Sequence, residues 1–377
     1  MTHSPGLLVT LIGFALVIGP LVFLHEMGHY LAGRVFGVKI DAFSIGFGRE
    51  LFGWTDRHGT RWKFSVLPLG GYVKFAGDLN AASEPDPAWL ELPAEERART
   101  LQGRPVWQRA IVVGAGPITN FIVAIAILAA FAMTYGVNRT PAVVGAVSPG
   151  SAAATIGLQT GDRITAINGR RMETFEDIYE FAVWRPGYPV VIDYDHAGIA
   201  VRRSTVLGTA VQRDSFGNSF KKGQLGIGPT TPVPHPVGLF EAPVVGVEMT
   251  GRILRSTVEG LGQVITGRRS VDDLGGPLRI AKVSGEQFSL GWPVLISFIA
   301  GVSINLGFIN LLPVPLLDGG HLFFYAIEAI RRRPVAPQVQ EWAFRGGLAA
   351  ILTLMMVVTI NDLRAFGLWK ALTGLIG

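Results

Sequence analysis

The fold is decided by the stretch GLLVTLIGFALVIGPLVFL at residues 6–24, which is followed at once by HEMGH at residues 25–29. The first part carries no charged residue. At about 1.5 Å per residue, a helix of this length approaches the ~30 Å hydrocarbon core of a bilayer. A cleaved signal peptide is the alternative, but it would have a basic start, and residues 1–5 contain no Lys or Arg. We therefore expect a membrane-spanning helix that carries His and Glu side chains at its end.

The HEMGH segment has the spacing of a metal-binding helix. His25 and His29 are four residues apart, which places both imidazoles on one helix face, where they can bind one ion. Glu26 projects about 100° round the axis and can act as a general base on a water beside that ion. The alternative is a helix end with ordinary polar residues. Because a charge at the centre of a span costs about 2.5–3.5 kcal/mol, three ionisable residues together favour a shared metal-binding role.

A third candidate ligand lies in NLLPVPLLDGGH at residues 310–321. Pro313 and Pro315 cannot continue a helix through this segment. Non-helical backbone at membrane depth is tolerated only where it is buried in protein or lines a wet cavity. A catalytic zinc takes three protein ligands, and Asp318 follows the break directly. A helix N-cap is the alternative role for Asp318. His321 is more simply a packing residue or a partner of a ligand.

The composition of the whole chain is that of a membrane protein. Of 377 residues, 49% are apolar and only 16% are charged, whereas about a quarter are charged in a typical soluble domain. The net charge of +5 suits positively charged cytoplasmic loops better than nucleic-acid binding, so we expect no nucleic-acid partner. Because the chain has no cysteine, any metal must be held by His, Asp or Glu.

Three further apolar runs bring the number of expected spans to about four. They cover residues 111–134, 292–312 and 346–360. The run at 292–312 resumes over 316–330 after the proline break. Lys and Arg are concentrated between residues 34 and 109 and at 331–333. Because positively charged loops face the cytoplasm, both termini and residues 135–291 are expected outside. The HEMGH end of the first span then lies near the cytoplasmic side.

The first cytoplasmic loop contains a hairpin signal. Residues 61–66 alternate polar and apolar side chains, residues 67–71 have the composition of a turn, and residues 72–75 have the pattern of a return strand. The apolar face, with Trp62 and Phe64, suits a membrane surface as well as a protein core. We therefore expect a membrane-associated β-hairpin or sheet.

Between the second and third spans the pattern changes to that of an α+β module. Residues 141–229 contain short strands, a tight turn at 168–169, a helix at 175–184 and strands at 189–195 and 199–206. A Pro-rich linker and amphipathic helices follow. The expected division is a first membrane half, the module, the linker and a second membrane half, at residues 1–134, 135–229, 230–290 and 291–377.

Taken together, the motifs resemble those of the site-2 proteases, a family of intramembrane zinc metalloproteases, and most closely its bacterial regulator of sigma-E type. The resemblance covers nearly the whole chain, from the HEMGH motif to Asn310-x-x-Pro313-x-Pro315-x-x-Asp318-Gly319. It implies Zn²⁺ held by His25, His29 and Asp318, with Glu26 as the catalytic acid and base. It also implies that substrate is bound by residues beside the site: Asn305, Asn310, Gly70, Gly71 and Tyr72.

The α+β insert resembles a bacterial PDZ domain of the circularly permuted kind. Leu225, Gly226 and Ile227 stand where the loop that binds a peptide carboxylate would be, and the peptide would add a strand. Well-known members of this type carry two PDZ domains, whereas this chain has room for one.

The resemblance implies hydrolysis within or near transmembrane segments of single-pass proteins in the lipid bilayer of a bacterial-type inner membrane. Examples would be an anti-sigma factor or remnant signal peptides, whether or not another protease cuts them first. The alternative is a membrane-anchored PDZ binding protein with a structural or inert metal site, but an inert site has no need of Glu26. A soluble exported zinc protease is a third hypothesis, against which the further spans argue.

Overall fold

The computed structural model describes residues 5–80, 89, 91–138, 140–213, 219–231, 234–267 and 275–365. The chain divides into two compact units. Unit 1 consists of Met1–Leu128, Gly246–Leu254 and Gly275–Asp362, and unit 2 of Ala129–Val245, Arg255–Leu274 and Leu363–Gly377.

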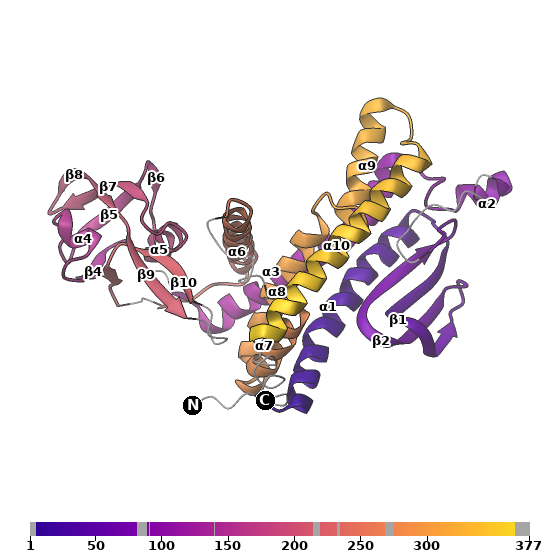
Figure 1. The fold of residues 1–377 in the computed structure, drawn as a ribbon, viewed down its shortest axis with the longest axis horizontal. Coiled ribbons are helices and arrows are strands. Elements are labelled where there is room, and N and C mark those ends of the chain that lie inside the picture. The colour runs from indigo at the N-terminus through magenta and orange to yellow at the C-terminus, as the bar shows by residue number, and fades with distance from the viewer. Residues whose placement is uncertain are drawn as a thin grey trace, which may run out of the picture. The chain divides into compact units, whose positions relative to one another are not determined.

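Four helices in the described part of the chain are long and apolar enough to cross a membrane, which confirms the predicted number of spans. They are α1 (Leu7–Val35), α3 (Val106–Tyr135), α8 (Trp292–Asn310) and α10 (Pro337–Ala365) (Figure 1). The predicted extension of the last span towards Leu368 lies outside the described residues. The chain is therefore a membrane protein.

Apolar side chains hold the spans of unit 1 together. Val17 and Leu21 of α1 are buried with Leu295 of α8. A second cluster joins α3 to α8 through Ala124, Leu128, Ala300 and Ile304. The short helix α7 (Pro277–Ser289) packs along the first half of α1, where Gly13 meets the backbone of Ser284 and Gly285.

The helix break predicted at the prolines is present. Helix α8 ends at Asn310, and the next helix, α9, runs from Asp318 to Arg331. Leu316, in the connection, has a φ of 82°, a backbone conformation that is strained for a bulky residue. Gly319 and Gly320 then let the start of α9 pack against the connection, because an added Cβ would meet the carbonyl oxygens of Leu312 and Val314.

The segment in which the hairpin was predicted contains β1 (Ile40–Thr55) and β2 (Arg61–Phe75), which form a two-stranded sheet in contact with α1 (Figure 1). Residues 42–45 of β1 pair with two segments of β2. Ala42 lies opposite both Lys74 and Arg61, and Ile45 lies opposite both Gly71 and Phe64. This part of β1 therefore lies between the two halves of β2.

The predicted pairing of this hairpin is wrong. We expected residues 72–75 to return beside residues 61–66, but residues 42–45 lie between the two segments. The alternation of polar and apolar side chains predicts that a segment is a strand, but not which strand lies next to it. Residues 71–75 are consequently an outer segment of the sheet, and they face α1, where Gly71 meets Val22 and Glu26.

Unit 2 contains the α+β module. Its main sheet has the strand order β6-β5-β7-β8. The strands are β5 (Arg163–Ile167), β6 (Arg170–Arg171), β7 (Pro189–His196) and β8 (Ile199–Val206). Asn168 and Gly169 have φ values of 49° and 77°, as a tight Asn-Gly turn requires. The predicted strands and turn are therefore confirmed.

Two short helices and three strand pairs accompany this sheet in unit 2. The helices are α4 (Ala152–Thr155) and α5 (Phe175–Val183), which begins with a capping box of Thr174 and Asp177. The strand pairs are β4 (Val144–Val147) with β11 (Ile227–Pro229), β9 (Gly208–Arg213) with β10 (Ser219–Gln224), and β3 (Val137–Asn138) with β12 (Pro234–His235). The sequence did not predict β9 and β10, which are short and rich in polar side chains.

Two helices remain, one in unit 1 and one that spans both units. Helix α2 (Ala94–Ala98) belongs to the polar connector between β2 and α3. Helix α6 (Ala242–Ile265) is the amphipathic helix predicted after the proline-rich linker. Pro232 of that linker lies outside the described residues.

Candidate metal centre

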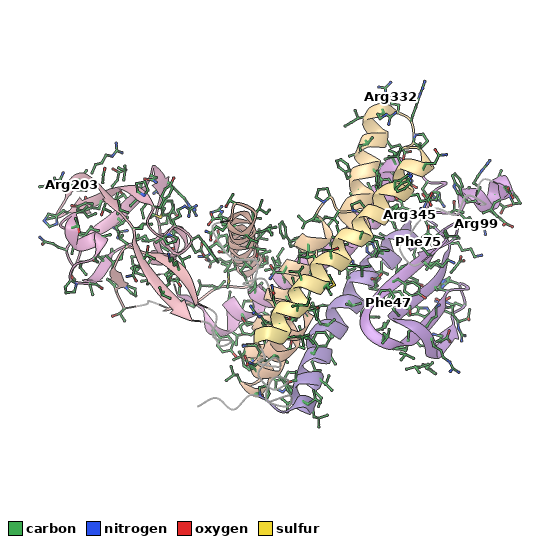
Figure 2. The ribbon with its side chains drawn as sticks, in the orientation of Figure 1. Phe47, Phe75, Arg99, Arg203, Arg332 and Arg345 are labelled. Atoms are coloured by element: carbon green, nitrogen blue, oxygen red, sulfur yellow. The ribbon has the colours of Figure 1, made fainter. Side chains whose placement is uncertain are left out.

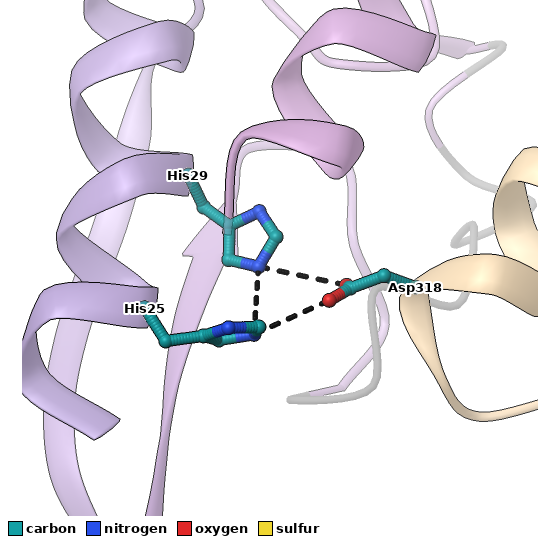
Figure 3. Close-up of side chains that lie close together, drawn as sticks. All are labelled: His25, His29 and Asp318. Carbon is teal, nitrogen blue, oxygen red and sulfur yellow. Dashed lines mark hydrogen bonds and ion pairs between the residues drawn. The ribbon is translucent and has the colours of Figure 1, made fainter. Parts of the chain in front are cut away.

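Helix α1 presents two imidazoles on one side near its end. The Nε2 atoms of His25 and His29 are 3.3 Å apart. Asp318, the first residue of α9, faces both of them: its Oδ2 lies 3.2 Å from Nε2 of His25 and its Oδ1 lies 3.5 Å from Nε2 of His29 (Figure 3). The structure thus brings together side chains from two helices that are almost three hundred residues apart in the sequence.

The separations within this cluster fit a shared metal ion. Ligand atoms about 2.0–2.1 Å from a tetrahedral zinc are about 3.3 Å from one another, and the observed separations are 3.2, 3.3 and 3.5 Å. The two nitrogen–oxygen distances involve different oxygens of Asp318. When one ligand atom is taken from each of the three residues, these atoms all lie within 4.8 Å of one another. Two imidazoles and a carboxylate are a donor set that zinc accepts, with a fourth position for water or substrate.

The cluster is buried because α3 passes close to α1. A Cβ added at Gly116 of α3 would meet the ring of His29, and one added at Gly28 would meet the backbone of Ala115. Only glycine permits this approach. His25, Glu26 and His29 are each less than a tenth exposed. These polar side chains are therefore surrounded by protein and not by solvent.

Asp318 owes its position to the break between α8 and α9. The N-cap of α9 is Leu317, and Asp318 is the first helical residue. The alternative interpretation of Asp318 as an N-cap is therefore wrong. A carboxylate in the first turn still benefits from the partial positive charge at the helix N-terminus, which favours its ionised, metal-binding form.

Glu26 lies beside the cluster and against β2. The backbone N–H of Val73 lies near the Glu26 carboxylate. A Cβ added at Gly71 would be 3.0 Å from Cγ of Glu26 and 2.8 Å from the carbonyl oxygen of Ser44. The strand can approach Glu26 this closely because residue 71 has no side chain.

The far sides of both imidazoles face α3. Nδ1 of His29 is 2.9 Å from the carbonyl oxygen of Val112, and Nδ1 of His25 is 3.0 Å from the side-chain amide of Asn120. Our sequence reasoning assigned Asn120 no role. The signal that could have found it is a polar amide within an otherwise apolar span.

The other predicted site residues of unit 1 lie on α8, α9 and β2. Asn305 lies within α8 and Asn310 is its last residue, and both are partly buried. The buried His321 ring lies 5.2 Å from the ring of Phe344, which agrees with a packing role. The substrate-binding residues predicted on β2, Gly70 and Tyr72, make contacts within the sheet of β1 and β2.

Those hairpin contacts involve Gly70 and Tyr72. Gly70 has a φ of 144° and packs against Phe47, which Figure 2 labels on the hairpin. The Tyr72 hydroxyl accepts a hydrogen bond from Nζ of Lys63 at 2.9 Å. The substrate-binding role of these residues remains a prediction.

The loop predicted to bind carboxylates lies in unit 2. Leu225 is buried in the module core, and its carbonyl oxygen accepts a hydrogen bond from the N–H of Ala153 at 2.9 Å. Gly226 has a φ of 83° and packs against Ser151. Ile227 begins β11 and pairs with Val147. These contacts shape the loop, and its ligand remains a prediction.

Known proteins resemble this chain along most of its length. The sequence model of Peptidase family M50 matches residues 13–354. The protein named "Putative zinc metalloprotease R01501" from Rhizobium meliloti is 46% identical over 93% of this chain and 95% of its own. Metalloprotease MmpA from Caulobacter vibrioides is 35% identical over 98% of this chain and 99% of its own.

A partial likeness among solved structures is to a PDZ domain. The PDZ domain of the SdrC-like protein from Listeria monocytogenes is 23% identical and covers 25% of this chain and 92% of that domain, with a TM-score of 0.20.

The relatives span nearly the full chain, and the buried cluster of two imidazoles and a carboxylate fits zinc, the metal in the name of the Rhizobium relative. The chain therefore belongs to peptidase family M50 and is a membrane-embedded zinc metalloendopeptidase of the site-2 protease type.

Proposed function

We propose that this enzyme hydrolyses peptide bonds within or near the transmembrane segments of single-pass membrane proteins, at a zinc ion held by His25, His29 and Asp318. The observation that carries the proposal is the buried cluster of three ligand atoms at zinc-like separations, with Glu26 one residue from a ligand on the same membrane helix. Because two of the helices around the cluster, α1 and α3, are membrane spans, its substrate is one that reaches it through the membrane.

Zinc bound at this cluster supplies a Lewis acid that polarises the scissile carbonyl and lowers the pKa of water. Glu26 accepts the proton of the attacking water and delivers it to the leaving nitrogen as the C–N bond breaks. The N–H of Val73 and the close packing of Gly71 hold Glu26 in place for both transfers. Asp318 and the two imidazoles hold the ion.

A membrane helix must unwind before it can be cut, because its carbonyl groups are already hydrogen-bonded within the helix. Residues 71–75 are an outer segment of the sheet and lie beside Glu26. An extended substrate can pair with this segment as an added strand, which would satisfy its backbone hydrogen bonds near the cluster. Asn305 and Asn310 then hold the substrate backbone over the metal.

The enzyme is proposed to lie in a bacterial-type inner membrane with its termini and its PDZ-like module outside. In unit 1, α1 and α9 end and α10 begins at the same end, where Figure 2 labels Arg332 and Arg345 (Figure 1). Arg34 is in the last turn of α1 and Arg331 in that of α9. This clustering of arginines supports a cytoplasmic position for that end.

Reporter fusions test the orientation. A reporter that is active only in the cytoplasm should work when it is fused near Asn80 or Arg332 and fail when it is inserted in the turn at Gly198. Activity at Gly198 together with failure at the other two positions would reverse the proposed orientation.

The module is proposed to select substrates by binding a peptide carboxylate at Leu225, Gly226 and Ile227. In this mode the peptide pairs with an exposed strand while backbone N–H groups hold its C-terminus. Since the described residues contain one such module, selection would depend on a single binding site rather than on a pair.

Replacement of Glu26 by Gln tests the catalytic mechanism. The variant keeps the size and polarity of the side chain, so zinc content and fold should be retained. Loss of a general base lowers the rate by about 10²–10⁴-fold, so cleavage of a model membrane-helix substrate should become nearly undetectable. Glu95→Gln makes the same chemical change on exposed helix α2 and should cleave at the parental rate. Parental cleavage by Glu26→Gln would reject the mechanism.

A further inference from the structure

We propose that Asn120 is a positioning residue that fixes the proton of the His25 ring on Nδ1, so that Nε2 is free to bind the metal. This inference rests on the proposed ligand set. It comes from a contact between α1 and α3: the side-chain amide of Asn120 lies 3.0 Å from Nδ1 of His25. Asn120 is completely buried, so water does not compete for this contact.

The ring of His29 shows which proton arrangement the site requires. Its Nδ1 is 2.9 Å from the carbonyl oxygen of Val112. A carbonyl oxygen only accepts hydrogen bonds, so Nδ1 of His29 must carry the proton. Its Nε2 then keeps a lone pair, and this is the atom that faces Asp318. The second ring nitrogen of a metal-binding histidine usually donates to such an acceptor.

His25 needs the same arrangement, because its Nε2 also faces Asp318 and His29. Asn120 can offer either end of its amide to Nδ1. If Nδ2 donated to Nδ1, the ring proton would be on Nε2, which could not then bind the metal. If Oδ1 accepts from the Nδ1 proton, Nε2 is free.

The surroundings of the amide do not oppose the second orientation. With Nδ2 towards His25, Oδ1 of Asn120 is buried and has no hydrogen-bond partner among the described residues. Rotation of the amide group by half a turn exchanges the two atoms and brings Oδ1 to Nδ1 of His25, where it gains a hydrogen-bond partner. The position of the ring proton therefore decides the orientation of the amide. When Nε2 of His25 binds the metal, the proton lies on Nδ1 and Oδ1 of Asn120 accepts from it.

The backbone of Asn120 is also held in place. The hydroxyl of Ser303, on α8, donates to the carbonyl oxygen of Asn120 at 2.8 Å, and Ser303 is completely buried. Helix α3 therefore supplies both acceptors behind the imidazoles. One is a backbone carbonyl that no substitution removes, and the other is a side chain that can be replaced.

Zinc affinity of the full-length protein in detergent tests this inference without reference to activity. The affinity is measured by competition with a chromophoric chelator at fixed pH. Asn120→Leu has a similar size and no acceptor, and should weaken zinc binding by about 10–100-fold. Asn120→Asp places an ionised carboxylate at this position, which can accept a hydrogen bond but not donate one. Its zinc affinity should stay within a few-fold of the parental value. Ser303→Ala keeps the Asn120 side chain and should also stay close to the parent.

Two outcomes would overturn the inference. Parental zinc affinity in Asn120→Leu would show that His25 needs no partner. Equal losses in Asn120→Leu and Asn120→Asp would show that the amide donates to His25 instead of accepting from it. His25→Ala separates this inference from the ligand assignment, because undiminished zinc binding in that variant would reject the ligand set itself. Thermal unfolding of each variant, followed by circular dichroism, identifies any that fails to fold.

Discussion

The metal cluster of unit 1 and the loop at residues 225–227 of unit 2 each depend on a glycine. The absence of a side chain at that glycine leaves room for a neighbouring residue. At Gly116 an added Cβ would meet the ring of His29, and at Gly226 it would meet Ser151. The two glycines differ in backbone conformation. Gly116 lies within helix α3, whereas Gly226 has a φ of 83° that few other residues adopt.

This difference separates two ways of building a site. The loop is formed within one module, by segments that pair with strands of the same module. The cluster needs α1, α3 and α9 at once, and its polar groups have apolar helices around them. Substitutions in the loop should therefore act on substrate choice, and substitutions in the cluster on zinc content and on the chemical step.

The largest expected effect is the loss of zinc on removal of Asp318. Asp318→Ala deletes the one anionic ligand and leaves two buried imidazoles without it, so zinc content after purification should fall from about one per chain to nearly none. Atomic absorption of the purified protein measures this. His321→Ala is the control, because His321 lies three residues away on the same helix and should leave most of the zinc in place.

Full zinc retention in Asp318→Ala would remove this residue from the ligand set. Complete loss in His321→Ala would instead promote His321 to a ligand. Either result would change the comparison, because the cluster would then depend on different positions of α9.

A smaller effect is expected from Gly226→Ala. A side chain at positive φ costs about 1–2 kcal/mol, and here the new Cβ also meets Ser151. Gly150→Ala is a matched control, since Gly150 has a φ of 70° with open space around it. Hydrogen exchange of residues 225–227 should rise more in Gly226→Ala than in the control, while zinc content stays at the parental level.

Substrate choice completes this test. Gly226→Ala should change the preference among substrates with different C-termini and leave cleavage of a short, pre-trimmed substrate nearly unchanged. A parallel loss on both kinds of substrate would contradict the separation of roles between the loop and the cluster.

Much of the site could be predicted because its parts are local patterns. The spacing of His25 and His29 on a helix and the ionisable residues within an apolar span are both visible in a single segment. Asp318 was found because two prolines forbid a continuous helix beside it. Each of these signals needs only the covalent sequence and the geometry of one element.

Other features could not be predicted because they are contacts between segments. The insertion of residues 42–45 between the two halves of β2 involves strand neighbours, which alternation does not encode. Asn120 is an ordinary polar residue until α3 packs against α1 and places its amide at His25. Gly116 likewise becomes necessary only when the ring of His29 fills the space beside it.

The sequence by itself determined four spans, an α+β module and the three residue types that a zinc site needs, because hydrophobic length and helical spacing are properties of single segments. Only the tertiary structure decided that β2 lies against Glu26 and that α3 provides the polar groups behind both imidazoles. The physical reason is that the proton on an imidazole and the position of a carboxylate are set by neighbours across helix and strand contacts, which folding alone brings together.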